Sequence, residues 1–128
     1  MNYFDFLTRV IDDGIAAARV NYADQPHKCE GAVAGFEACR GKHPFQLAQL
    51  LIEANAQADK AFRAHDDVDN CWRLRCYVLE VEWVCNVVSC AIMNQDPKHA
   101  VIVTPTARGF MKAAEILGVK PIEASSLS

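Results

Sequence analysis

The sequence predicts an all-α fold, a single domain of about five helices over residues 1–121. Apolar residues recur at spacings of three and four almost from end to end, which is the period of an amphipathic helix, whereas the strict alternation typical of strands hardly occurs. Prolines and glycines stand between the periodic segments, where they end one helix and begin the next. With 128 residues, 52% apolar and 23% charged, the chain is long enough to form one hydrophobic core.

The first two helices are expected over about residues 3–22 and 27–40. Pro26 suits the first turn of the second helix, because proline fixes φ at a helical value and needs no hydrogen bond there. In that helix Gly31 and Gly35 stand one turn apart. Since glycine weakens a helix, we expect these two to allow the close approach of a neighbouring backbone.

A third helix is expected over about 44–64 and a fourth over about 68–94, with Asp67 as a candidate N-cap of the fourth. The fourth is the longest and most apolar segment, so we expect it to be the central helix of the bundle, wrapped by the others. Its apolar residues form two stripes: Trp72, Cys76, Leu79, Trp83, Val87 and Cys90 in one, and Leu74, Val78, Val81, Cys85, Val88 and Ile92 in the other.

Residues 100–103 are expected to be extended, and a fifth helix is expected from Thr104–Pro105 to Gly118. Thr104 suits an N-cap, and the proline suits the first helical position. Residues 122–128 are expected to be a frayed tail. The fifth helix has one apolar face, formed by Ala107, Phe110, Met111, Ala114 and Leu117.

The charge balance argues against nucleic acid as a partner. Thirteen Lys and Arg against sixteen Asp and Glu give a formal net charge of −3, without a dense basic run. The first residues do not form a secretory signal, and the longest uncharged apolar stretch, residues 83–93, is too short to cross a bilayer. We therefore expect a cytoplasmic protein with no membrane partner.

The six cysteines are expected to be reduced thiols with a packing role. Four of them, Cys71, Cys76, Cys85 and Cys90, fall in the expected fourth helix. Residues five or more apart on one rigid helix cannot reach disulfide distance. Small thiols are also among the most commonly buried side chains.

A zinc-stabilised module remains an alternative, because two thiols and two imidazoles flank the second helix. The set is His27, Cys29, Cys39 and His43, with the spacing H-x-C-x9-C-x3-H. Tetrahedral zinc sites usually contain tighter C-x2–4-C pairs, which this set lacks.

Charged residues on the expected fourth helix offer a second candidate site. Arg73 and Arg75 precede Glu80 and Glu82 by seven residues, so each pair shares one side of the helix. Such charges can bridge to a neighbouring helix, to the same helix of a second copy or to a polar ligand. With His65 they would line the pocket of a small-molecule or metal-dependent enzyme, which is the competing functional class.

The second half of the chain resembles small uncharacterised proteins of tailed phages and prophages. The resemblance rests on the string from Glu80 to Ser89 (EVEWVCNVVS), on Pro105–Gly109 (PTARG) and on Met111–Ala114 (MKAA). It implies a compact accessory or host-directed binding protein and carries over no catalytic residues.

The sequence therefore favours a non-catalytic helical protein-interaction module that self-associates, with a dimer as the expected form and another protein as the alternative partner. No hydrolase, nucleotide-binding or other catalytic motif occurs, so we assign no catalytic residue and no cofactor. If the fourth helix is apolar beyond what its neighbours cover, its remaining face must meet another protein surface. Trp72 and Trp83 are the expected contacts there.

Overall fold

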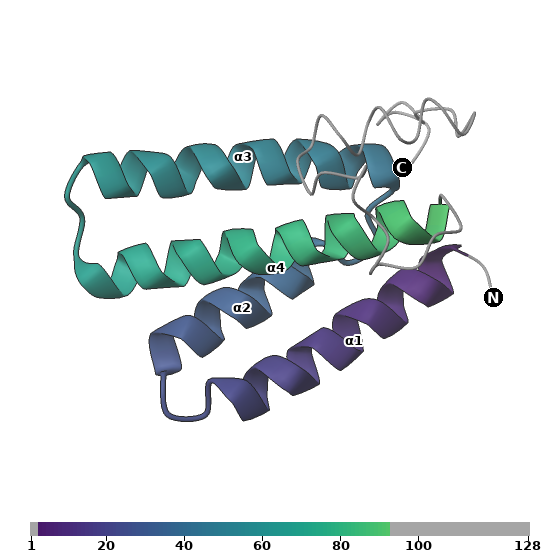
Figure 1. The fold of residues 1–128 in the computed structure, drawn as a ribbon, viewed down its shortest axis with the longest axis horizontal. Coiled ribbons are helices and arrows are strands. Elements are labelled where there is room, and N and C mark those ends of the chain that lie inside the picture. Colours follow the sequence, from purple (N-terminus) through teal and green to yellow (C-terminus); the bar gives the residue numbers. More distant parts are fainter. Residues whose placement is uncertain (1–2, 93–128) are drawn as a thin grey trace.

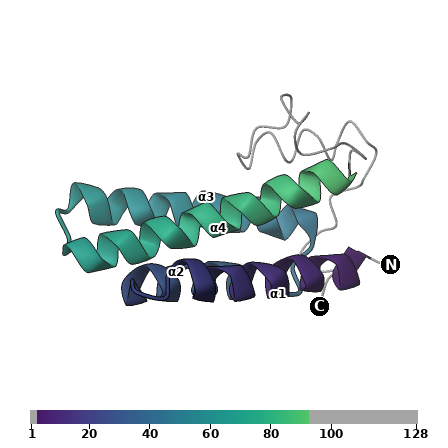
Figure 2. The same ribbon diagram turned by 60° about the horizontal axis from the view of Figure 1, so that its bottom comes forward.

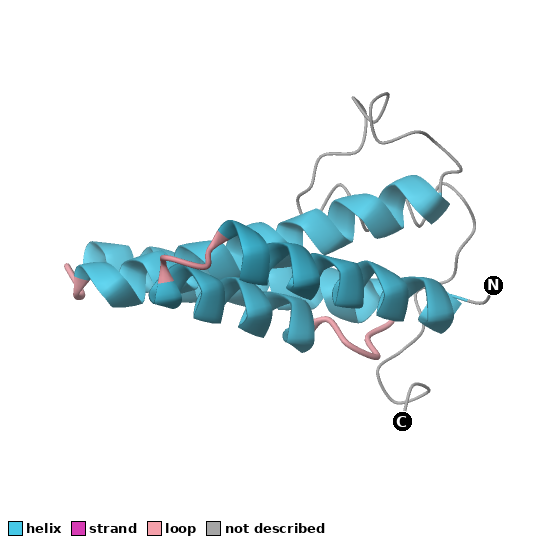
Figure 3. Ribbon diagram, turned by 90° about the horizontal axis from the view of Figure 1, so that it is seen from below, coloured by secondary structure: helices cyan, strands magenta, loops and turns pink. Residues whose placement is uncertain are grey.

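The computed structural model describes residues 3–92, and this part of the chain is all-helical, as the sequence predicts (Figure 1). Figure 3 shows helices joined by short loops over the same residues. The fifth helix, the extended run over 100–103 and the tail over 122–128 lie outside the described residues. Four helices are described: α1 (Tyr3–Asn21), α2 (Pro26–Ala38), α3 (Pro44–Arg63) and α4 (Val68–Ile92).

The α4 helix occupies the central position that the sequence predicts. It packs against α2 on one side and α3 on the other and has a smaller contact with α1, which packs mainly on α2. Figure 1 shows α4 between α3 and the α1–α2 pair, and Figure 2 shows α1 and α2 as one layer beneath α3 and α4. The described fold is thus two helical hairpins stacked on each other.

The core is formed by one apolar stripe from each helix. Its members are spaced three or four residues apart, as expected for the side of a helix that faces its neighbours. The fully enclosed side chains include Leu7 and Ile11 of α1, Ala32 of α2, Leu47 and Leu51 of α3, and Val81, Val84, Cys85 and Val88 of α4.

The two glycines of α2 allow its backbone to lie directly on that of α4, which confirms their expected role. A Cβ atom on Gly31 would collide with the backbone carbonyl of Arg73. A Cβ atom on Gly35 would lie 2.7 Å from the carbonyl oxygen of Tyr77. Neither position has room for a methyl group, so the spacing between α2 and α4 depends on glycine at both.

The α3–α4 connection begins with a tight reversal at His65, which has a left-handed φ of 52°. The backbone N–H of Asp66 donates to the carbonyl of Ala61 at 3.1 Å, and that of His65 donates to the carbonyl of Phe62 at 3.2 Å. This hydrogen-bond pair is the Schellman motif that ends many helices, usually with glycine at the left-handed position.

The same connection starts α4 through a side-chain cap. The carboxylate oxygen of Asp67 accepts a hydrogen bond from the backbone N–H of Asn70 at 2.8 Å. The carbonyl of Asp67 accepts the first helical bond, from Cys71, at 3.0 Å. Asp67 is therefore the N-cap of α4, as its position in the sequence predicts.

The expectation that α4 is apolar and buried on two sides is wrong for the described fold. The stripe containing Val78, Val81, Cys85 and Val88 is buried, but the side chains of Trp72, Leu79 and Trp83 are exposed. Phe62 of α3 is exposed as well. The reason is geometric: α2 and α3 contact two sides of α4, and no helix within residues 3–92 covers these three side chains of α4 fully.

Candidate functional site

An open groove of about 820 Å³ runs between the end of α3 and the first half of α4. Neither α1 nor α2 contributes to it. We call it the α3–α4 groove. Its lining residues are Asn55, Ala58, Asp59 and Phe62 of α3, His65 and Asp66 of the connection, and Val68, Cys71, Trp72, Arg75, Val78, Leu79 and Glu82 of α4.

Large apolar side chains stand exposed in and beside this groove. Within it, Phe62 is 75% exposed, Val68 69%, Trp72 44% and Leu79 42%. Trp83, which does not line the groove, is 50% exposed one turn further along α4. Isolated exposed apolar residues are common, but a group on one face typically marks a binding surface. Trp72, Leu79 and Trp83 together are called the α4 ridge below.

The ring of Trp72 is held from the α2 side by a cation. The ammonium nitrogen of Lys28 lies 4.1 Å from the centroid of the Trp72 ring, within the range of a cation–π interaction. The contact stabilises this position of the ring while Trp72 stays 44% exposed. A rigid aromatic surface of this kind loses little conformational entropy when a partner binds.

The charged side chains that line the groove are mostly acidic. Three carboxylates, those of Asp59, Asp66 and Glu82, stand against the single guanidinium of Arg75. Asp59 pairs with Arg63 at 2.9 Å. Among residues 3–92, neither Glu82 nor Arg75 forms an ion pair, so both remain available to a partner.

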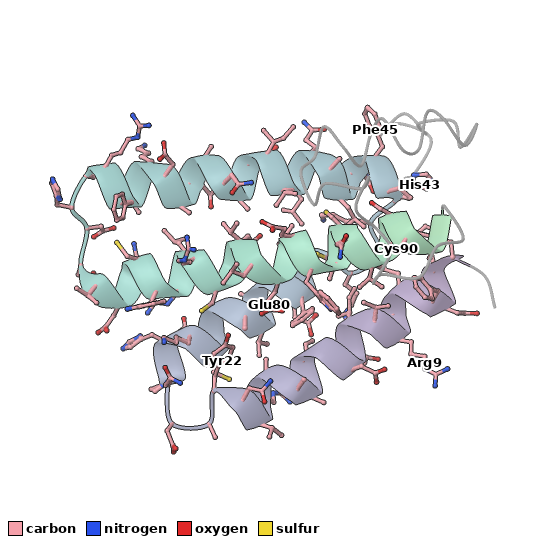
Figure 4. All side chains as sticks on the ribbon, in the orientation of Figure 1. Arg9, Tyr22, His43, Phe45, Glu80 and Cys90 are labelled. Carbon is pink, nitrogen blue, oxygen red and sulfur yellow. The ribbon has the colours of Figure 1, made fainter. Side chains whose placement is uncertain are left out.

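The four charges that the sequence singles out on α4 do not form one pocket. Arg75 and Glu82 line the groove, whereas Arg73 and Glu80 lie on the α2 side of the helix. Figure 4 shows Glu80 on the side of α4 that faces the α1–α2 layer. Residues two apart on a helix point about 200° apart around the axis, which separates Arg73 and Glu80 from Arg75 and Glu82.

Arg73 bridges to α2, the first of the three roles that its sequence position allows. Its Nε lies 3.3 Å from Oε1 of Glu30, as an ion pair without hydrogen-bond geometry. One terminal nitrogen lies 3.1 Å from Nδ1 of His27, and the other lies 3.1 Å from Oδ1 of Asn70. This cluster ties the start of α2 to the start of α4.

Glu80 is half-buried against α2, and burial raises the pKa of its carboxyl group. Gly35 lies directly below it, since a Cβ atom on that glycine would be 3.3 Å from the Cβ atom of Glu80. The charge also contributes, after desolvation and the effect of Cys76, to the raised pKa of Tyr22. Glu80 is thus a partly desolvated acid within the fold and is not open to a ligand in the groove.

Some of the residues that the sequence suggests for an enzyme site lie at the groove. His65, Arg75 and Glu82 all line it. The nearest thiol, that of Cys71, donates to the carbonyl of Asp66 at 3.6 Å and has no hydrogen bond to an imidazole. Within residues 3–92 the groove therefore lacks the paired nucleophile and base that covalent catalysis requires.

The possible zinc ligands are not brought together. Cys29 and Cys39 lie ten residues apart along α2, which corresponds to about 15 Å. Both ring nitrogens of His27 already have partners. Since the guanidinium of Arg73 can only donate, Nδ1 of His27 accepts a hydrogen bond from it, and Nε2 of His27 lies 3.2 Å from a carboxylate oxygen of Asp69. His43 is at the start of α3 (Figure 4). No group of three His, Cys, Asp or Glu side chains within residues 3–92 is arranged to hold a metal ion.

The cysteines are thiols, and those in the core are poor nucleophiles. Burial raises the pKa of Cys39 to about 12, and its thiol donates to the carbonyl of Gly35 at 3.3 Å. Burial likewise raises the pKa of Cys85, whose thiol donates to the carbonyl of Leu47 at 3.5 Å. Because the thiolate is the reactive form, these residues serve packing.

Comparisons with known proteins leave the chain without an assigned family: no family model, curated protein or solved structure matches it. None of the helices in residues 3–92 has the combination of length and apolar character needed to cross a membrane. The geometry of the α3–α4 groove and the α4 ridge is therefore the basis for a functional assignment.

Proposed function

We propose that this chain is a non-catalytic helical protein-interaction module that self-associates as a dimer through the α4 ridge. One observation carries the proposal: Trp72, Leu79 and Trp83 are 42–50% exposed on one side of the central helix. Tryptophan is usually among the more buried residues of a monomer, and at interfaces it is among the residues that contribute most to affinity. Two of them on one exposed helix face favour a protein partner.

The spacing of the ridge favours a second copy as that partner. Trp72 and Trp83 are eleven residues apart, so they point within about 20° of each other and lie about 16 Å apart along the axis. If two copies of α4 pack antiparallel about their midpoint, Trp72 of one copy lies opposite Trp83 of the other. A two-fold interface requires this kind of self-complementary surface, and the paired rings would bury large apolar areas.

The second half of the chain resembles small phage and prophage proteins, and the accessory or host-directed binding role that this resemblance implies fits such a module. A different protein that uses the same ridge is the other possible partner. The two cases differ in solution, because a self-associating chain forms dimers without any addition.

The test is sedimentation velocity of the reduced full chain and two matched variants. We expect the wild type to sediment as a dimer and Leu79→Glu to sediment as a monomer, because a charge would be buried at the centre of the ridge. The control is Ile52→Glu, which changes an equally exposed apolar residue of α3 that lies outside the ridge and the groove lining. Circular dichroism establishes that both variants are folded.

If the two variants weakened the dimer equally, the interface would not lie at the ridge. A wild-type chain that is monomeric at every concentration, with all three proteins folded, would contradict self-association. Since both altered side chains are solvent-exposed in the described fold, neither substitution removes a core contact.

A further inference from the structure

We infer that the α3–α4 groove is occupied by residues 104–117 of the same chain, docked as a helix. The groove is helix-sized: its α4 side runs from Val68 to Glu82, which is about 21 Å at the helical rise. Fourteen residues, the length of 104–117, span about the same distance when helical. The groove and the α4 ridge share Trp72 and Leu79, but the argument for this proposal does not rest on self-association.

The chain beyond α4 is long enough to reach the groove. The distance along α4 from Ile92 back to Glu82 is ten residues of helix, about 15 Å. The eleven residues from Met93 to Val103 can span up to about 36 Å when extended. A segment that starts at the Glu82 end therefore runs antiparallel to α4 and ends near the α3–α4 connection. The short tether also gives the segment a high effective concentration at the groove.

The apolar face of the segment matches the apolar lining of the groove. Phe110 and Met111, with Ala107, Ala114 and Leu117, form one stripe at helical spacing. The groove presents Phe62 and Val68, which are 75% and 69% exposed in the described fold. Burying these side chains against each other removes apolar surface from water on both partners.

The charges are complementary as well. Residues 93–121 carry four basic side chains, Lys98, Arg108, Lys112 and Lys120, and two acidic ones, Asp96 and Glu115. The groove carries three carboxylates and one guanidinium. In the antiparallel direction, Arg108 lies toward Glu82 and Lys112 toward Asp59. The positive end of the docked helix dipole also lies beside the carboxylate of Glu82.

The experiment is cysteine-to-lysine cross-linking of the full chain, with equal amounts of unlabelled and ¹⁵N-labelled protein mixed before reaction. A maleimide–succinimide reagent links the thiol of Cys71, which lines the groove, to nearby amines. The expected product joins Cys71 to Lys112, with both peptides unlabelled or both labelled. That isotope pattern shows that the segment and the groove belong to one chain.

Two variants test the docked face. Phe110→Asp places a charge in the apolar stripe, and we expect loss of the Cys71–Lys112 product. The matched control is Ile116→Asp, which changes an apolar residue about 120° or more from Phe110 and Met111 around the expected helix, and this variant should keep the product.

Three results would overturn the inference: no Cys71–Lys112 product while both residues react singly, a product that survives Phe110→Asp, or products that mix labelled and unlabelled peptides. The last would assign the segment to the groove of a second copy. A dimer with only unmixed products would support both this inference and the proposed function, whereas a monomer with only unmixed products would contradict the proposed function alone.

Discussion

Gly35 of α2 and Tyr77 of α4 are packed so closely that a Cβ atom on the glycine would lie 2.7 Å from the tyrosine carbonyl oxygen. Real Cβ atoms do not approach a backbone oxygen this closely, so the two helices must move apart to admit any other residue. The same holds one turn earlier, where Gly31 lies against the carbonyl of Arg73. The crossing of α2 and α4 is therefore fixed by backbone contact.

Gly35→Ala should destabilise the protein by about 1–3 kcal/mol, the usual cost of overpacking. In an exposed helix the same change would stabilise by up to about 1 kcal/mol, because alanine is the better helix former. The sign of the change in stability therefore distinguishes close packing from an open helix face. Urea unfolding of the two proteins measures it, and greater stability of the variant would mean that the α2–α4 spacing is not fixed here.

His65→Gly should stabilise the protein by about 0.5–1 kcal/mol, because His65 is held at a left-handed φ that glycine adopts without steric cost. The control is Ala64→Gly at the preceding position, where φ is −79°. That variant should lose stability through its freer unfolded chain. Thermal unfolding gives both values, and a lower melting temperature for His65→Gly would rule out the Schellman geometry.

Stability should fall as the pH rises above 9. In the unfolded chain Cys39 loses its proton near its ordinary pKa of 9.0, whereas in the folded protein burial holds its pKa at about 12. Between these values the unfolded state releases a proton that the folded state keeps, so the free energy of unfolding decreases by up to about 1.4 kcal/mol per pH unit.

Urea midpoints between pH 8 and pH 11 check this slope. Cys39→Ala should make it shallower without abolishing it, because burial also raises the pKa of Cys85, and Cys71→Ala, at a partly exposed position, should retain the wild-type slope. If both variants kept the wild-type slope, Cys39 would not be one of the buried groups that titrate in this range.

Glu80→Gln should stabilise the protein more at pH 7 than at pH 4. Burial raises the pKa of Glu80 in the folded state, so the unfolded state ionises first and the wild type loses stability as the pH rises through this interval. The glutamine variant has no charge to desolvate. Chemical unfolding at both pH values measures the difference.

The matched control for Glu80→Gln is Glu82→Gln, whose carboxylate lies in the open groove. If Glu80→Gln stabilised the protein at pH 7 no more than Glu82→Gln does, desolvation of Glu80 against α2 would not be the cause of the stabilisation.

The helix boundaries in residues 3–92 were predictable because local signals define them. Pro26 and Pro44 begin α2 and α3, as the helical period and the special backbone of proline indicate. Asp67 was identifiable as an N-cap, and Gly31 and Gly35 as close-packing positions, from their own chemistry. These features depend on neighbours within a turn or two of chain, which a sequence displays directly.

Trp72 and Trp83 were predicted as contacts with another protein, but the exposure of their whole stripe was not predictable, because periodicity groups residues by side without showing which side meets the core. Trp72, Leu79 and Trp83 form an apolar stripe whether they face a neighbouring helix or another molecule. The partner of Arg73 on α2 was equally hidden, since it depends on where α2 crosses α4. The left-handed conformation of His65 had no sequence signal, because glycine is the usual residue there.

Native mass spectrometry of the reduced, gently purified full chain tests the central claim most directly, since one spectrum reports the number of subunits and any retained ligand. We predict a species of twice the chain mass with no added mass, which Leu79→Glu converts to the single chain. A single chain carrying the added mass of zinc or an organic molecule would contradict the interaction module and favour a ligand-binding site instead.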